Sequence, residues 1–267
     1  MILSGKSAIE LGTRGFGVLA IVSFAYYPLM KLANTLTREI LSVFPPERIS
    51  FLESQRVVIL PIWGIGVAIL YVAISPILGC SLVELFVRNF RTEMLAIGVL
   101  LGIGEGAVSL VLASFAFRVM GRVRSSVIHS EVSLELSLVG KAGWMRTFSD
   151  AFRIVPMPLS LILVFVALTG EELIFRAIVI PLFLPYSTAV AIGVSTLLFI
   201  TVQLSHLPSW YQGVAPACGA VVMGLVNGSV FVVLGNLTPL AVAHVAYLAF
   251  LIGPAALVPR VVDRGRW

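Results

Sequence analysis

The chain has 267 residues, of which 59% are hydrophobic and only 12% are charged, and its mean hydropathy is +1.05. A soluble globular domain carries about 25% charged residues, and a soluble fold of this size exposes too much surface to hide so many apolar side chains. The composition therefore predicts an integral membrane protein and excludes disordered, coiled-coil and disulfide-scaffold proteins. The net charge of +5 comes without any basic run, so it indicates membrane topology and contact with the lipid bilayer rather than nucleic-acid binding.

Seven apolar stretches are candidates to cross the bilayer, whose hydrocarbon core of about 30 Å takes about 20 helical residues. They predict an all-α fold, a polytopic transmembrane helical bundle of about seven to eight spans. In chain order the predicted spans are 15–30, 57–79, 94–117, 155–184, 187–206, 214–234 and 237–258. The segments 31–56 and 118–154 are expected to be polar loops, with an interfacial amphipathic helix near 128–139.

Basic residues gather in those two loops and in the C-terminal tail, whereas the other side of the predicted bundle carries few. Because positive charge stays on the cytoplasmic side of a membrane, both loops and the C-terminus are expected to be cytoplasmic. The span 155–184 is longer than one crossing needs, and Gly170 within it predicts a break in the helix.

Glycines recur every four residues in two of the predicted spans. Gly98, Gly102 and Gly106 form one such series, and Gly224 and Gly228 form the other. Small residues at this spacing let helix backbones approach closely within a membrane. The series therefore predict close helix packing within the monomer.

Ionisable residues inside a membrane span are costly, so each one needs a partner or a function. Glu105, between two glycines, is interpreted as the donor or acceptor of a structural hydrogen bond to another helix. The segment Glu171-Glu172-Leu-Ile-Phe-Arg176 carries more information. Glu172 and Arg176 are four residues apart with the acid first, which favours an ion pair on a helix.

Glu171 points about 100° away from Glu172 on a helix, so Arg176 cannot easily serve both carboxylates. A buried carboxylate without its own cation is a plausible general base. We therefore assign a structural role to Glu172 and a chemical role to Glu171. The alternative is that all three residues form one structural salt-bridge cluster between helices. His206 and His244, on later spans, favour the chemical interpretation because a neutral imidazole can move a proton or bind an oxyanion.

The ordered set resembles the CPBP family, which comprises the CAAX-prenyl endopeptidases and bacteriocin-processing (ABI) membrane proteases. The residues that carry the resemblance are Glu171-Glu172-x-x-x-Arg176, the segment VQLSH that ends at His206, and the segment LTPLAVAH that ends at His244. The resemblance implies a protease core at 151–258, preceded by unassigned transmembrane segments and a cytoplasmic loop at 1–150. A polar tail at 259–267 completes one integrated membrane domain.

The resemblance also implies an activity and a role for each residue. Glu171 would activate a water for attack on a peptide carbonyl, His206 would help polarise that water, and His244 would bind the oxyanion. Glu172 and Arg176 would hold the helix and the glutamate in place. The implied substrate is a membrane-associated polypeptide that can be lipidated, and the implied location is a prokaryotic cell membrane.

No cofactor is expected to be required. If zinc is bound, Glu171, His206 and His244 would be its three ligands. A simple ladder of seven spans places His206 and His244 near opposite faces of the membrane. A shared site therefore requires broken, tilted or re-entrant helices.

Two positions depart from the family pattern. Val202 stands where the second motif usually has Phe, and Leu248 stands where the last motif usually has Asn. Leucine cannot donate a hydrogen bond, Tyr247 points about 100° away from that position, and Asn227 is the nearest other amide in sequence. Loss of one oxyanion donor can cost about 10² to 10³ in rate.

This departure keeps alternatives to an active protease open. One is a catalytically degenerate family member that acts as a membrane scaffold or immunity-type protein. Another is a proton-coupled carrier that uses the glutamates and histidines as a relay. Internal repeats are the usual sign of a carrier, and none is visible in this sequence.

Overall fold

The computed structural model describes residues 28–43, 50–123, 143–205, 207 and 210–252. Within these ranges every regular element is a helix, so the predicted all-α class is confirmed. A first helix covers 28–43. The others are α2 (Phe51–Leu78), α3 (Leu82–Val87), α4 (Glu93–Val123), α6 (Gly143–Ile154), α7 (Met157–Glu172), the π-helix η1 (Leu173–Val179), α8 (Ile180–Phe183), α9 (Thr188–Ser205), α10 (Trp210–Leu234) and α11 (Thr238–Ile252).

Four helices within the described ranges are long and apolar enough to cross a membrane. They are Glu53–Leu78, Glu93–Met120, Thr188–Ser205 and Gln212–Leu234, and Thr238–Leu251 is a shorter apolar helix. These helices support an integral membrane protein. The predicted count of seven to eight spans is not confirmed, and most of the predicted span 15–30 and the predicted amphipathic helix near 128–139 lie outside the described residues.

The two segments expected to be loops are helical where the structure describes them. Residues 28–43 form a helix, and α6 occupies the end of the segment 118–154. The expectation of loops was wrong because the charges of these helices sit on one face. In α6, for example, Phe148 and Ala151 are buried while Arg146 is exposed. Ion pairs then join α6 to α2, between Arg56 and Asp150 at 2.7 Å and between Arg153 and Glu53.

The predicted break at Gly170 is also absent. The helix runs through Gly170 and continues as η1 and α8. Gly170 instead lies at a close approach of α7 to α2, since a Cβ atom there would lie 3.3 Å from the Cα atom of Gly64. The irregularity falls just after the glutamates, where seven residues adopt a π-helix. π-helical turns inside α-helices are rare and are frequently found at functional sites.

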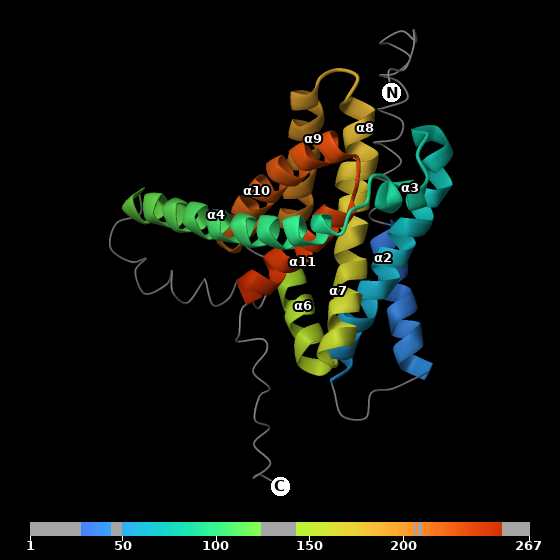
Figure 1. Cartoon of the computed structure of the whole chain (residues 1–267). Coiled ribbons are helices and arrows are strands. Elements are labelled where there is room, and N and C mark those ends of the chain that lie inside the picture. Colours follow the sequence, from blue (N-terminus) through green and yellow to red (C-terminus); the bar gives the residue numbers. More distant parts are fainter. Residues whose placement is uncertain (1–27, 44–49, 124–142, 206, 208–209, 253–267) are drawn as a thin grey trace.

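The helices form a bundle in which α7 and its continuation are the central element (Figure 1). α2 packs alongside α7, and α9 and α10 pack against each other and against η1. α4 runs across the direction of α7 and packs against α11 and α10 (Figure 1). Every helix that carries a predicted site residue therefore meets at η1 or at the end of α7.

The predicted glycine packing is confirmed, and it joins α4 to α11. A Cβ atom at Gly98 would overlap Val242, one at Gly102 would overlap the backbone carbonyl of Ala243, and one at Gly106 would meet the Phe250 ring. The absence of side chains on this ridge of α4 lets the two backbones approach closely. In the second series, Gly224 of α10 lies against Thr196 of α9 and Gly228 lies near Ile192.

The start of α11 is tied to the end of α3. The Asn236 side-chain amide donates to the carbonyl oxygens of Phe86 at 3.1 Å and Arg88 at 2.6 Å. Its own oxygen accepts from the Thr238 backbone N–H at 2.7 Å. The backbone N–H of Leu237 donates to the Leu85 carbonyl at 2.8 Å. These bonds fix the register in which α11 enters the bundle.

We predict that Gly102→Ala lowers the stability of the protein, because the added methyl group would overlap the α11 backbone next to His244. Overpacking of this kind typically costs about 1 to 3 kcal/mol. Gly104→Ala is the matched control, since a Cβ atom there has no neighbour within 4 Å. Thermal unfolding of both variants in detergent measures the difference. Equal midpoints for the two variants would contradict the packing described here.

Candidate functional site

Arg176 is the anchor of a buried polar cluster. Its side chain is fully buried, and its Nε atom lies 3.2 Å from Oε2 of Glu172, as the sequence predicted. Its Nη1 donates to the Ser195 hydroxyl and its Nη2 to the Met223 carbonyl, each at 3.2 Å. The guanidinium also lies over the Phe199 ring, 5.2 Å from the centroid. A buried guanidinium needs such a set of partners, because an unpaired charge in a low-dielectric interior is very costly.

Glu172 links this anchor to α11. Its second oxygen, Oε1, lies 2.9 Å from Nδ1 of His244. The carboxylate is therefore held on one side by Arg176 and on the other by the imidazole. Because an ion-paired carboxylate accepts hydrogen bonds, Nδ1 is the nitrogen that donates, and this sets the orientation of the ring.

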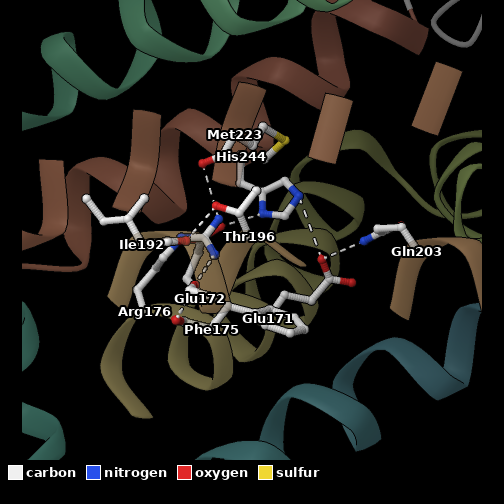
Figure 2. Close-up of polar contacts among 10 residues, drawn as sticks. Glu171, Glu172, Phe175, Arg176, Ile192, Thr196, Gln203, Met223 and His244 are labelled. Atoms are coloured by element: carbon white, nitrogen blue, oxygen red, sulfur yellow. Dashed lines mark hydrogen bonds and ion pairs between the residues drawn. The ribbon is translucent and has the colours of Figure 1, made fainter. Parts of the chain in front are cut away.

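Glu171 faces the other nitrogen of the same imidazole. Its Oε2 atom lies 3.8 Å from Nε2 of His244 and accepts a hydrogen bond of 3.2 Å from the side-chain amide of Gln203 (Figure 2). The side chains of Glu171 and His244 each keep 6% of their surface exposed, whereas those of Glu172 and Arg176 keep 1% and 0%. The least enclosed part of the cluster is thus the Glu171–His244 pair.

Aromatic rings hold the His244 imidazole in place. The Phe199 ring of α9 packs edge to face against it with centroids 6.1 Å apart, and the Tyr247 ring, on the same helix as His244, does so at 6.5 Å. Phe199 also packs on Phe175 of η1 at 5.0 Å. The imidazole is therefore positioned both by its bond to Glu172 and by packing.

The structure brings together four of the five predicted site residues: Glu171, Glu172, Arg176 and His244. The separation of His206 from His244 that a simple ladder of spans implies is not tested, because His206 lies outside the described residues. α11 begins deep in the bundle at its junction with α3, so His244 reaches the glutamates although it lies near the start of its helix. The fifth residue, His206, lies outside the described residues.

Sequence reasoning missed the partners that α9 and α10 supply. Gln203 on α9 contacts Glu171, Ser195 on α9 bridges Arg176 and the Phe175 carbonyl, and Met223 on α10 contributes only its backbone oxygen. Gln203 left a signal in the sequence, because it is an amide within an apolar span three residues before His206. Ser195 and Met223 left none, since serine is common in membrane helices and a carbonyl belongs to every residue.

Glu105 and Asn227 are buried polar residues beside this cluster. Glu105 on α4 keeps 3% of its surface exposed, and neither of its carboxylate oxygens has a hydrogen-bond partner among the described residues, so the predicted structural hydrogen bond is not found there. Asn227 on α10 is fully buried next to the Glu172 carboxylate. Both residues therefore lie near the Glu172–Arg176 pair.

At position 248, where the sequence departs from the family pattern, the side chain packs in the apolar core. Leu248 is buried in the main apolar cluster with 3% of its surface exposed. The Tyr247 hydroxyl lies against Gly219 of α10 and points toward Ser109 of α4, away from the glutamates. Neither residue offers a hydrogen-bond donor to the Glu171–His244 pair.

Glu171 and His244 present two of the three donors expected for a zinc ion, and the third, His206, is not among the described residues. Within the part of the chain that the structure describes, no group of three or more His, Cys, Asp or Glu side chains is arranged to hold a metal ion. The expectation that no cofactor is required stays a prediction, and a chelator tests it below.

Residues 153–250 match the family model for type II CAAX prenyl endopeptidases of the Rce1-like kind. The match begins at the end of α6, ends within α11 and contains every site residue described above. It confirms the resemblance to the CPBP family of membrane proteases over this part of the chain. Neither a curated protein nor a solved structure matches the chain.

We predict that Arg176→Met destabilises the protein strongly, because it leaves Glu172 as a buried carboxylate without its cation. Removing one partner of a buried ion pair typically costs about 3 to 5 kcal/mol. Arg146→Met on α6 is the control, since Arg146 is exposed and should tolerate the same change. Thermal unfolding in detergent compares the two. Arg176→Lys should be intermediate, because it keeps the charge and loses the planar fork that reaches Ser195 and Met223.

Proposed function

We propose that this protein is an intramembrane endopeptidase that hydrolyses a peptide bond of a membrane-associated or prenylated polypeptide. The observation that carries the proposal is the Glu171–His244 pair, with Oε2 and Nε2 3.8 Å apart, backed by the buried Glu172–Arg176 ion pair. Two atoms at this separation are too far apart for a direct hydrogen bond and close enough for one water to contact both.

In the proposed reaction, Glu171 takes a proton from that water as its oxygen attacks the carbonyl carbon of the scissile bond. The carbonyl π electrons move to oxygen and form the oxyanion of a tetrahedral intermediate. The proton on Glu171 then passes to the leaving nitrogen as the C–N bond breaks. The products are a carboxylic acid and an amine, and transfer of the acid's proton to the amine leaves a carboxylate and an ammonium, so atoms and charge balance without any further reactant.

His244 supports this chemistry through Nε2, because Nδ1 is occupied by Glu172. Protonated at Nε2, the imidazole stabilises the developing oxyanion, and the buried Glu172 carboxylate stabilises the imidazolium. His206 is proposed to polarise the attacking water, as the resemblance implies. Glu172 and Arg176 act by holding His244 and η1 in place.

The substrate class follows from the surroundings of the site and from the family. The helices around the cluster present apolar side chains outward, including Leu197 on α9 and Val233 on α10, so a substrate would approach through or along the membrane. The matching family is named for prenyl endopeptidases. A polypeptide with a lipid anchor next to the scissile bond fits both properties.

A non-catalytic role is the second candidate, and Leu248 is the observation that favours it. A degenerate family member would keep the Glu172–Arg176 pair for stability and act as a membrane scaffold or immunity-type protein. A proton-coupled carrier is less favoured. The described residues of the cluster form the Glu172–Arg176 ion pair and the neighbouring Glu171–His244 pair, rather than a series of sites across the bundle.

We predict that the purified protein cleaves a fluorescence-quenched farnesylated CAAX peptide in detergent or vesicles. Glu171→Gln should reduce kcat by about 10² or more while leaving the unfolding midpoint close to that of the parent, because the substitution removes the general base and keeps the shape. His244→Ala and His206→Ala should each lower kcat. Glu93→Gln, at an exposed glutamate on α4, is the matched control.

Repeating the cleavage assay after incubation with a chelator distinguishes a glutamate-and-water mechanism from a zinc mechanism. Activity that survives prolonged incubation with a strong chelator supports the reaction written above, whereas loss that zinc restores assigns the metal to Glu171, His206 and His244. Cleavage unaffected by Glu171→Gln would overturn the proposed mechanism. Absence of cleavage by the parent protein would favour the scaffold.

A further inference from the structure

Among the described residues, few hydrogen-bond donors for an oxyanion lie beside Glu171 and His244, and this makes the position of Gln203 important. Stabilisation of the tetrahedral oxyanion is usually the largest single contribution to acyl-transfer catalysis, and it relies on donors aimed at the place where the charge develops. His244 has one nitrogen left for this purpose. The side chain at position 248 has no donor, and Asn227 is fully buried behind Glu172.

Gln203 is the one described side-chain amide in direct contact with Glu171. Its Nε2 atom carries two hydrogens, and one of them is used in the 3.2 Å bond to Oε2 of Glu171 (Figure 2). Among the residues that the structure describes, no acceptor is bound to the other hydrogen. Gln203 is also half-buried, so a substrate can reach it, in contrast to Asn227.

The distances fit an oxyanion donor. A carbonyl oxygen attacked by a water on Glu171 lies about 4 to 5 Å from that carboxylate, by addition of ordinary hydrogen-bond and contact distances. An acceptor bound by the second N–H of Gln203 lies about 3 Å from Nε2 and so within about 6 Å of the same carboxylate oxygen. One amide can therefore hold Glu171 with one hydrogen and the oxyanion with the other.

We propose that Gln203 is a catalytic residue that donates its second amide hydrogen to the oxyanion, from α9, and so supplies the donor that Leu248 cannot. The inference rests on the proposed function. The bond to Glu171 fixes the amide before substrate arrives, which is the preorganisation that makes such a donor effective. Gln203 and His244 then approach the oxyanion from different helices.

The decisive variant is Gln203→Leu, which keeps the approximate size of the side chain and removes both hydrogens. The cleavage assay with the farnesylated peptide should show a loss of kcat of about 10² to 10³ with KM unchanged. A peptide phosphonate of the same sequence, which carries charged oxygens in tetrahedral geometry, should bind more weakly by a similar factor. Thr201→Val on the same helix is the matched control, because the Thr201 side chain is exposed and bonds its own helix.

A purely structural role for Gln203 gives a different result. If the amide only positions Glu171, Gln203→Leu should change the shape of the pH–rate profile and leave phosphonate affinity unaltered, and this outcome would overturn the inference. A Gln203→Leu protein that cleaves within about threefold of the parent would overturn it as well.

The double variant Gln203→Leu/Leu248→Asn provides a gain-of-function arm. The new amide lies one helical turn beyond His244 on the same face of α11 and returns a donor to the oxyanion from another direction. The kcat of the double variant should therefore be at least about tenfold higher than that of Gln203→Leu. Failure of the inference is distinguishable from failure of the proposed function. Parent activity that Glu171→Gln abolishes supports the function whatever Gln203→Leu does, and an inactive parent protein would overturn both.

Discussion

A positive charge with no exposed surface, the guanidinium of Arg176, sets the arrangement of the whole site. Such a charge is tolerable only with a carboxylate and several acceptors in fixed positions, and here Glu172, Ser195 and Met223 provide them. Each partner comes from a different helical segment, so satisfying one residue aligns α7, η1, α9 and α10. Because Glu172 is then held in place, its second oxygen can orient His244.

This arrangement divides two adjacent glutamates between support and chemistry. Glu172 is enclosed by its cation and by the imidazole, whereas the partners of Glu171 among the described residues are a neutral amide and the far nitrogen of the same ring. The π-helix begins directly after them, and the wider turn continues the helix while Arg176 still reaches back to Glu172. A local irregularity of the backbone and a division of roles thus occur at the same point in the chain.

The sequence was sufficient for the helical class, the Glu172–Arg176 pair and the glycine packing, because each depends on spacing along one helix. It was not sufficient for contacts that depend on how helices cross. The depth of His244 follows from the tie between Asn236 and α3, and Gln203 reaches Glu171 only because α9 packs on η1. Gly170 was interpreted as a break because a glycine in a helix can mark either flexibility or close approach, and only the position of Gly64 distinguishes the two.

The glycines of α4 at positions 98, 102 and 106 lie outside the stretch that matches the protease family. They nevertheless pack directly against α11, the helix that carries His244. The recognisable region is therefore one half of an interface rather than a separable module. A chimaera that joined residues 153–250 to foreign N-terminal helices would need a helix with equally small residues opposite Val242, Ala243 and Phe250. Any change of residue size on α4 must be matched on α11, so these two parts of the chain are constrained to vary together.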